Sequence, residues 1–513
     1  MINKKKLKSY GNLSNHLIMR TILVFFLILL LSQSCNFLKT EGKESLSFPE
    51  LLGFKQGKGI NIFSPGDDEY LSAIEVDDAG NVYALGHVKS AATTDQDLFL
   101  VKVDFAGKLI WKVILDSRYS QILDSSGSES SSSLYLDEKN KVLYLAGVTT
   151  GSFIENNLPG SSDILIAKVT TSGALLWVKH FGEETQEDFK TKLGNSNLDW
   201  SKDDLVGQLR MDPSNNLIMT FSTGGNFFEE NGGVATTDIG VMNINPDSGE
   251  IVKGLQLGSA TMAAWGISQG IVTNASRNET ISQSSFDFDG NNAVIPLRTT
   301  GSLVETNSSS SSDAGYFVVD SNLNILTIKQ IGAATYADWV SKGNFAGATT
   351  GDDQFRSVAV LSSGDYLFYG KSSSRMGLIN QGTDYLFARF VGNELVGLNQ
   401  HPILGNEEPR HMTKAPNGDI YCSGHVRTTI FDETNGVLKP LVFKVSQNGE
   451  ILSGYQMGEA TAGRLNLLDN NYNLVVTQGF QVKRGRIYFG FNNRPDGSNG
   501  ITDSYLWTIP IKD

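Results

Sequence analysis

Short runs of apolar and β-branched residues recur along residues 54–513, and Gly, Asn, Asp and Ser separate them. Runs of roughly five to eight residues with such boundaries are typical of β-strands. Three segments repeat the order strand, tight turn, strand, loop, strand, tight turn, strand: 70–115, 132–182 and 409–458. Four weaker copies occupy 208–258, 283–332, 356–400 and 474–513. This self-similarity predicts seven repeats of one four-stranded unit.

The turns of the repeated unit share their chemistry. Asp78–Asn81 and Pro416–Asp419 join the first two strands of their units, and Phe105–Lys108 and Gln447–Glu450 join the last two. Each has glycine at its third position, and glycine permits the positive φ that a tight hairpin requires. Each unit is therefore predicted to be an antiparallel meander.

The two ends of the repeat array are complementary. The last unit lacks a fourth strand, while Gly57–Phe63 precedes the first unit and has the pattern of an isolated strand. Pairing them closes a ring and removes exposed sheet edges. The prediction is an all-β, seven-bladed β-propeller of four-stranded antiparallel blades, closed by an N-terminal strand. An alternative alignment makes 485–491 the third strand and 505–511 the fourth, and leaves the N-terminal strand unexplained.

The repeat resembles the bacterial SBBP-type β-propeller repeat. Asp77–Gly86 and Asp97–Trp111 match its pattern, and Asp137–Gly147 and Asp163–Trp177 match it without the Gly-Asn turn. The resemblance covers residues 54–513 and implies a propeller, but it implies no single activity. The unit is also similar to quinoprotein-type repeats, whose cofactor-binding residues it does not match, so no cofactor is expected.

The first 34 residues have the pattern of an export signal. Residues 1–20 are basic and contain no acid, and Thr21–Leu31 is an apolar run. That run is short for a membrane span and suits a signal-peptide core. The following Ser32–Cys35 resembles the lipobox of bacterial lipoproteins, in a loose form similar to that of spirochaetes, because Ser32 stands where Leu is usual.

The resemblance implies that Cys35 is lipidated and becomes the mature N-terminus. The predicted organisation is a signal peptide (1–34), a polar tether (35–53) and a single propeller domain (54–513). The alternatives are a plain secretory signal or an uncleaved anchor, and translation from Met19 would shorten the signal. The expected location is the cell envelope, at the outer membrane or cell surface, with the membrane contacted through the N-terminal lipid.

Charge and cysteine content narrow the choice of partners. The chain carries a net charge of −13, and an acidic protein repels phosphate backbones, so no nucleic-acid partner is expected. The two cysteines are too few for a disulfide framework. Cys422 lies in a predicted strand and is expected to be a small buried residue.

Length variation is concentrated on one face of the predicted ring. The first and third turns of a meander lie on one face, and the second loops and inter-blade links lie on the other. The long segments are Thr149–Ser162, Ser222–Thr237, Thr299–Asp313, Lys371–Thr383, Asn492–Thr502, Asp116–Ser132, Glu183–Asp204 and Ala333–Gln354. Binding residues often lie on such loops above a rigid scaffold, so this face is the predicted binding face.

Most residues whose side chains could bind a metal or take part in catalysis have structural interpretations. His87 and His425 share a repeat position, and Asp287–Asn292 resembles a calcium loop but falls at a predicted turn. An Asp that recurs before the third strand is expected to cap turns; its copies are Asp97, Asp163, Asp238, Asp384 and Asp503. Trp111 and Trp177 are expected to pack between blades. The serine runs Ser130–Ser133 and Ser308–Ser312 are interpreted as spacers.

No catalytic, cofactor or metal residue is therefore assigned. The leading hypothesis is a non-enzymatic binding scaffold that takes a protein or glycan on its loop-rich face. The alternatives are a propeller enzyme (a hydrolase, a lyase or a quinone-dependent oxidoreductase) and an envelope-assembly lipoprotein.

Overall fold

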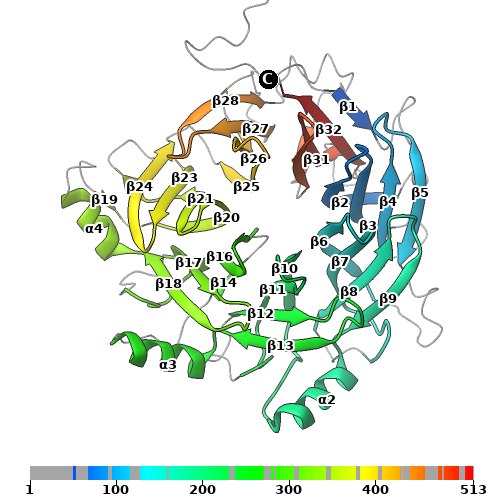
Figure 1. The fold of residues 1–513 in the computed structure, drawn as a ribbon, viewed down its shortest axis with the longest axis horizontal. Coiled ribbons are helices and arrows are strands. Elements are labelled where there is room, and N and C mark those ends of the chain that lie inside the picture. Colours follow the sequence, from blue (N-terminus) through cyan, green and yellow to red (C-terminus); the bar gives the residue numbers. More distant parts are fainter. Residues whose placement is uncertain are drawn as a thin grey trace, which may run out of the picture. The chain divides into compact units, whose positions relative to one another are not determined.

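The computed structural model describes residues 50–53, 67–89, 95–115, 127–156, 158, 161–229, 237–270, 279–281, 285–305, 311–341, 348–349, 351–376, 382–401, 407–427, 430, 439–456, 472–475, 479–495 and 503–511. Residues 46–513 form one compact unit. Seven antiparallel sheets of this unit surround a common axis (Figure 1). The predicted all-β, seven-bladed propeller is confirmed.

Each blade is a meander that begins at the axis and ends at the outside. Blade 1 has β2 (Asp68–Val76), β3 (Val82–Lys89), β4 (Gln96–Val103) and β5 (Leu109–Leu115); blade 2 has β6 (Glu129–Asp137), β7 (Val142–Thr149), β8 (Asp163–Thr170) and β9 (Leu175–His180); blade 3 has β10 (Asp204–Met211), β11 (Leu217–Thr223), β12 (Asp238–Ile244) and β13 (Ile251–Gln256). Blade 4 has β14 (Glu279–Thr280) and β15 (Asp287–Asp289) side by side with β16 (Asn292–Thr299), then β17 (Asp313–Val319) and β18 (Ile325–Ile331). Blade 5 has β20 (Asp353–Ser362), β21 (Asp365–Ser372), β23 (Asp384–Val391) and β24 (Glu394–His401); blade 6 has β25 (Glu408–Lys414), β26 (Ile420–Val426), β27 (Lys439–Val445) and β28 (Ile451–Gln456). A separate pair is β19 (Ala348–Thr349) with β22 (Arg375–Met376).

Blade 7 takes strands from both ends of the chain. The pair β29 (Tyr472–Val475) and β30 (Phe480–Lys483) precedes β31 (Arg486–Pro495) and β32 (Asp503–Pro510), and the outermost strand is β1 (Glu50–Gly53). Glu50 pairs with Thr508 and Gly53 with Tyr505, antiparallel. Closure by an N-terminal strand is confirmed, but the strand lies upstream of Gly57–Phe63, which is outside the described residues. An outermost strand is held mainly by backbone hydrogen bonds to one neighbour, so the pattern of its side chains is a weak signal in the sequence.

The hydrophobic core consists of seven clusters, and each cluster joins two neighbouring blades. The middle strands are covered on both faces by adjacent blades, so every residue of β11, β12 and β26 is buried. Cys422 of β26 is one of these core residues, as predicted. Strands buried on both faces lose the alternation of apolar and polar residues, which explains their continuous apolar runs.

Two tryptophans connect consecutive blades, as predicted. Trp111 lies on Gly173, whose φ is +93°, and its Nε1 donates to the carbonyl of Thr171 at 3.1 Å. Trp177 lies in the same way on Gly249 of the next blade, whose φ is +75°. A Cβ atom would lie 2.9 Å from the indole ring at Gly249 and 3.1 Å from it at Gly173, so the turn glycines serve close inter-blade packing as well as backbone conformation.

One serine run is part of the scaffold, and its interpretation as a spacer is wrong. Ser130–Ser133 lies within β6, the innermost strand of blade 2. Ser131 Oγ donates to Ser72 Oγ at 2.6 Å, and Ser133 Oγ accepts from the Leu209 N–H at 3.0 Å. Seven innermost strands converge at the axis, and small hydroxyl side chains fit there while bonding to their neighbours. Most of the other run, Ser308–Ser310, lies outside the described residues.

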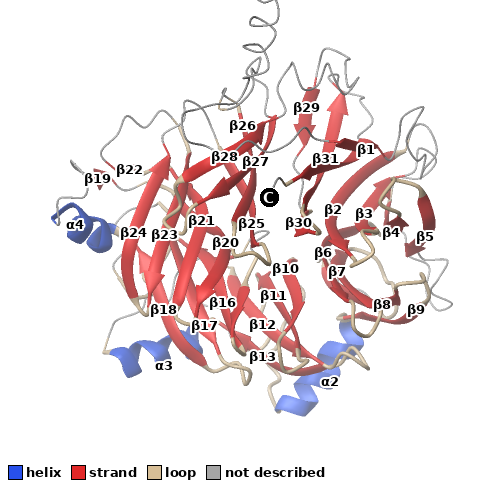
Figure 2. Cartoon of the chain, turned by 45° about the horizontal axis from the view of Figure 1, so that its top comes forward, coloured by secondary structure: helices blue, strands red, loops and turns tan. Residues whose placement is uncertain are grey.

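Three short helices follow blades 2, 3 and 4. They are α2 (Glu183–Leu193), α3 (Ser259–Gln269) and α4 (Ala333–Ser341), and they lie outside the ring (Figures 1 and 2). From the sequence these segments are predicted only as long links, not as helices. None of the helices in the described part of the chain has the length and apolar character needed to cross a membrane.

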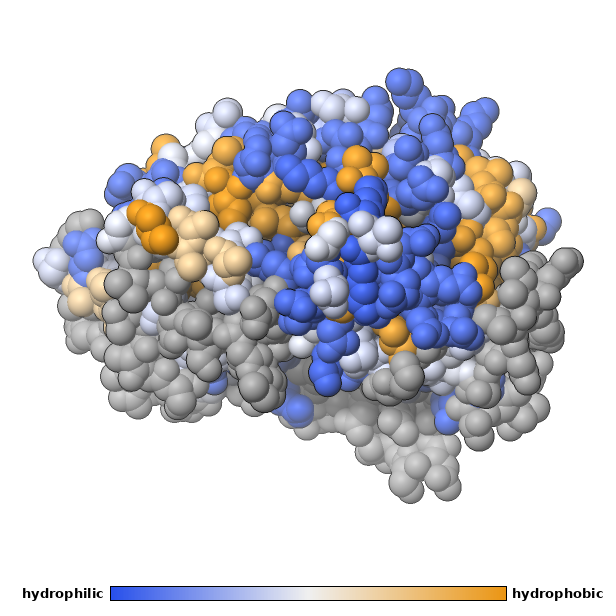
Figure 3. Space-filling model, turned by 90° about the horizontal axis from the view of Figure 1, so that it is seen from below, coloured by the Kyte–Doolittle hydropathy of each residue, from blue (hydrophilic) through white to orange (hydrophobic). Residues whose placement is uncertain are grey.

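The side of the ring seen in Figure 3 carries both apolar and hydrophilic residues. Seen edge-on, apolar residues form separate patches among hydrophilic ones (Figure 3). Several outermost strands expose one aliphatic side chain near their start, among them Ile110, Leu176, Val252 and Leu326. Single exposed aliphatics of this kind are ordinary on protein surfaces.

Candidate functional site

The two faces of the ring differ in the length of their connections. First and third turns have 2 to 6 residues, whereas second loops have 6 to 14 and inter-blade links 6 to 23. The second loops and links share one face, called here the loop-rich face; the opposite side is the tight-turn face. This is the asymmetry that the sequence predicts.

On the loop-rich face, buried aspartates at the start of third strands connect loops to outer strands. Asp163 accepts from the Leu158 N–H at 3.0 Å, as a capping role predicts. In three other blades the donor is instead a glutamine side chain at 2.7–2.9 Å, in the pairs Asp238–Gln256, Asp313–Gln330 and Asp384–Gln400. In blades 3 and 4 a Gln-x-Gly motif ends the unit and was a usable signal for this contact.

A second repeated contact caps the helices. Glu155 is 5% exposed and accepts from the N–H groups of Gly182 and Thr185, at 2.9 and 2.7 Å, and from Thr185 Oγ1 at 2.6 Å. Glu305 accepts equivalent bonds from Gly332 and Thr335 at the start of α4. These carboxylates satisfy free N–H groups of helix N-termini, which accounts for them structurally.

The histidines at the shared repeat position do not converge. His87 stacks on Tyr70 with ring centroids 5.0 Å apart, and burial lowers its pKa to about 4. His425 is 1% exposed, and burial followed by the charges of Arg410 and Arg356 lowers its pKa well below the usual value. The two residues stand in blades 1 and 6. Within the described residues, no three His, Cys, Asp or Glu side chains gather as a metal site.

Asp287–Asn292 forms a hairpin turn between β15 and β16. Asp287 Oδ2 accepts from the Val360 N–H at 2.9 Å, and Asp289 Oδ2 accepts from the Gly364 N–H and Tyr366 hydroxyl, both at 2.9 Å. The carboxylates therefore hold the neighbouring blade and do not converge on one point.

The strongest candidate site is a cavity of about 280 Å³ on the loop-rich face between blades 4 and 5, called here the loop-face pocket. Its lining is entirely polar: Thr280, Arg298, Ser312, Asp352, Asp353, Gln354, Arg356, Lys371, Ser373 and Thr383. The volume is near the lower end of the roughly 300–1,000 Å³ range of small-molecule sites. The pocket thus suits a small polar group.

Arg356 is the unusual residue of this pocket, because it is only 8% exposed and its guanidinium is incompletely paired within the described residues. Its Nη2 lies 3.5 Å from Glu408 Oε2, but Lys371 Nζ contacts the same carboxylate at 2.8 Å. Its Nε and Nη1 have no hydrogen-bond partner within the described residues. Burial lowers the pKa of Arg356 and the Glu408 charge opposes this, yet a guanidinium stays protonated at neutral pH.

A β-bulge places this side chain. The pairing of β20 with β21 shifts between Phe355 and Ser357, so Arg356 is the extra residue, and Arg410 lies in the corresponding bulge of β25. Bulges re-aim side chains at functional positions. Aligned units place Ser72 and Ser132 at this position in blades 1 and 2. The change from serine to arginine was not predicted as a functional signal, although the alignment of the repeats makes it visible.

Two further cavities, of about 70 and 260 Å³, lie among the innermost strands. His411 and Glu75 line both. Burial raises the pKa of Glu75 to about 8 against the attraction of Arg210 and Lys483. Arg210 is already committed, with Nη1 donating to the Phe286 carbonyl at 2.7 Å and lying 3.3 Å from Asp287.

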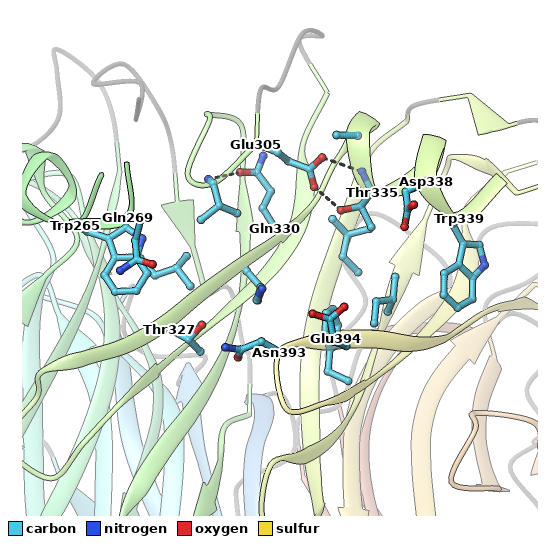
Figure 4. A pocket seen from close by; sticks show the side chains of 17 residues that line it. Trp265, Gln269, Glu305, Thr327, Gln330, Thr335, Asp338, Trp339, Asn393 and Glu394 are labelled. Atoms are coloured by element: carbon cyan, nitrogen blue, oxygen red, sulfur yellow. Dashed lines mark hydrogen bonds between the residues drawn. The ribbon is translucent and has the colours of Figure 1, made fainter. Parts of the chain in front are cut away.

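A larger cavity, of about 560 Å³, lies at the outer rim between α3 and α4. Figure 4 shows Trp265 and Trp339 at its two sides, with Glu305 pointing toward Thr335. Both tryptophans stand seven residues after a helix-capping glycine, as Phe189 does in α2. Phe189 packs on Trp200 and Phe228, with centroids 5.7 and 6.2 Å apart. This aromatic position is therefore a packing position of the repeat.

No known protein family matches this sequence, and no curated protein does. Among solved structures, the chain is similar to the polysaccharide lyase Uly1, with 11% identity and a TM-score of 0.46 over 93% of this chain and 100% of that one. It is also similar to an ulvan lyase described as a new polysaccharide lyase family, with 7% identity and a TM-score of 0.45 over 91% and 96%. A protein of unknown function from Dyadobacter fermentans has 10% identity and a TM-score of 0.40 over 88% and 100%. No residue role is transferred from any of them.

Proposed function

We propose that this chain is an exported, lipid-anchored β-propeller that binds a protein or glycan on its loop-rich face, without catalysis, at the cell envelope or surface. The single observation that supports binding most strongly is the loop-face pocket with its incompletely paired Arg356. A buried charge without full pairing is costly to a folded protein. A ligand group that accepts hydrogen bonds from Arg356 would offset this free-energy cost, which is why the residue points to a binding site.

The proposed export and lipid anchoring rest on Cys35 and the residues before it. Palmitate labelling of cells that express the wild type, with Cys35→Ala as control, tests lipidation. Protease shaving of intact cells then separates a surface location from a periplasmic one. Labelling of the wild type alone is expected, and equal labelling of both proteins would refute lipidation.

The binding part is tested by site-specific photo-cross-linking in cells. A photoreactive residue at Ser373 lines the loop-face pocket, and one at Ala106 in a turn of the tight-turn face is the matched control. Adducts are expected at Ser373 and not at Ala106. Adducts at neither position, together with turnover of a substrate panel by the purified chain, would overturn the scaffold proposal.

An enzyme is the second candidate, favoured by Glu75. With a pKa of about 8 this carboxyl is largely protonated at pH 7 and lies in a polar axial cavity, as a general acid does. Screening the wild type and Glu75→Gln against glycoside and ester substrates tests this candidate. Activity that the substitution abolishes would favour the enzyme, and inactivity of both proteins would remove its support.

A further inference from the structure

We infer that the loop-face pocket binds the anionic group of an acidic polysaccharide, either a uronate carboxylate or a sulfate ester, with Arg356 as the central contact. This inference rests on the proposed binding function and specifies its ligand.

The first step is the local charge, which is opposite in sign to that of the chain. Arg298, Arg356 and Lys371 line the pocket, and Arg410 lies close enough to lower the pKa of His425 together with Arg356. Two carboxylates oppose these four cations: Glu408, and Asp352, which is 4.0 Å from Arg298. A net cationic pocket in a chain of net charge −13 attracts an anion locally.

The remaining lining acid adds little negative charge. Asp353 accepts from the Tyr336 hydroxyl at 2.7 Å and from Ser374 Oγ at 2.9 Å, and burial raises its pKa to about 7. It is therefore partly protonated at neutral pH. Both of these partners are hydroxyl groups, and no ion pair joins it to Arg356 in the described part of the chain.

The second step is the donor inventory of Arg356. A guanidinium carries five N–H donors in a planar fork that matches carboxylate and sulfate oxygens. Only Nη2 approaches an acceptor, Glu408, and that carboxylate is shared with Lys371. Nε and Nη1 are buried without partners within the described residues. An entering oxyanion would satisfy these donors.

The third step selects the ligand class. Protein partners are anchored mainly through apolar and aromatic side chains, and no residue that lines the loop-face pocket is apolar. The hydroxyls of Thr280, Ser312 and Ser373 and the amide of Gln354 suit the hydroxyl groups of a sugar ring instead. A volume of about 280 Å³ admits a single acidic sugar residue of a longer chain.

The test measures binding of defined probes to the full-length protein in detergent at low and high salt. The probes are oligogalacturonate (carboxylates), dextran sulfate (sulfate esters), neutral dextran and poly-glutamate. The variants are Arg356→Gln, which removes the charge, and Arg356→Lys, which keeps the charge without the planar fork. Arg389→Gln is the matched control, because Arg389 is paired with Asp365 at 2.8 Å on the tight-turn face. Thermal melts establish that each variant is folded.

We expect at least one acidic polysaccharide to bind and Arg356→Gln to weaken it about tenfold or more, since hydrogen bonds to charged groups are among the strongest. Arg356→Lys should weaken it less, and Arg389→Gln should leave it unchanged. Preference between oligogalacturonate and dextran sulfate identifies the anionic group.

Three results would overturn the inference. The first is that Arg356→Gln and Arg389→Gln bind the acidic polysaccharide with equal affinity. The second is that neutral dextran binds the wild type as tightly as the acidic polysaccharide does. The third is that poly-glutamate binds the wild type as tightly as the acidic polysaccharide or more tightly. Cross-linking at Ser373 in cells, combined with any of these results, leaves the binding function standing and removes only the ligand class. Failure of both experiments removes the function itself.

Discussion

Acidic side chains on the two faces of the propeller have pKa values shifted in opposite directions. On the loop-rich face, burial raises the pKa of Asp313 to about 6, of Asp353 to about 7 and of Glu407 to about 9. On the tight-turn face, burial works against ionisation of Asp77 and Asp320, but hydrogen bonds from Asn81 and Asn324 outweigh it and lower both pKa values. The difference follows the length of the connections.

A tight turn offers its own donors to the carboxylate that starts it. Asp77 accepts from the N–H groups of Ala79 and Asn81 and from Asn81 Nδ2, at 2.8–3.0 Å. Under the longer connections, Glu407 is fully buried and neither of its carboxylate oxygens has a partner within the described residues. The ionised carboxylate of Asp77 therefore stabilises its turn, whereas burial holds the carboxyl group of Glu407 in its neutral form at pH 7.

The largest expected effect comes from a carboxylate that serves the fold on the loop-rich face. Glu155→Ala leaves two helix N–H groups and the Thr185 hydroxyl without their acceptor. The free energy of unfolding, measured by urea denaturation at pH 7, should fall by about 3 kcal/mol.

Its matched control lies on the same helix. Glu187 contacts Lys190 at 2.7 Å, but its side chain is 64% exposed, so Glu187→Ala should change stability by less than about 0.5 kcal/mol. Equal effects of the two substitutions would mean that burial does not distinguish these carboxylates.

A pH effect of opposite sign on the two faces is expected next. Asp353 has a folded pKa of about 7, against about 3.9 in an unfolded chain. The folded state therefore binds more protons between these values, and the free energy of unfolding falls as pH rises through that window. The contribution of Asp353 to this fall is about 2–3 kcal/mol between pH 5 and pH 8. Asp353→Asn should flatten the profile, and an unchanged slope would contradict the assignment.

Asp77 should show the reverse dependence with a smaller size. Its folded pKa is lowered, so its contribution is present above the unfolded pKa of about 3.9 and is lost as pH falls through the folded pKa. Asp77→Ala should cost about 1–2 kcal/mol at pH 7. The gap between wild type and variant should shrink below pH 4 in denaturation curves. A gap that grows on acidification would reverse the comparison.

The smallest of these effects is expected for an ion pair on the tight-turn face whose side chains are 23% and 15% exposed. Arg389 contacts Asp365 through two nitrogens, at 3.0 and 2.8 Å. Solvent screens such pairs, so Arg389→Gln should cost about 0.5 kcal/mol in low salt and less in high salt. A larger loss, insensitive to salt, would show that this face also holds charges in a dry environment.

The fold was predictable because each blade repeats a local pattern. Turn glycines such as Gly80 and Gly418, with φ of +84° and +89°, punctuate strands whose apolar runs match the burial of middle strands. The position of the closing strand was not predictable, because Glu50–Gly53 pairs through its backbone with a strand at the far end of the chain. The helices were missed for a similar reason, since their caps come from other segments, such as Glu155.

The face of the propeller that carries the candidate site was predictable from the sequence, but the residues of the site were not. Loop lengths indicate the loop-rich face, but Arg298, Arg356 and Lys371 are scattered through two repeats and meet only in the folded blades. No short motif connects them. What the sequence does contain is the contrast between Ser72 and Arg356 at one bulge position, a departure from the repeat that scaffold requirements do not explain.

The closing strand also determines which part of the propeller can form last during folding. Blades 1 to 6 each draw on one continuous stretch of chain, but the pairs of β1 and β32 join residues more than 450 positions apart. Contacts this distant carry a large loop-closure entropy and form late. During synthesis, β1 emerges before the other strands and has no partner until β32 follows. The ring therefore closes only after β32 has been made, and a chain truncated before Asp503 leaves β1 unpaired.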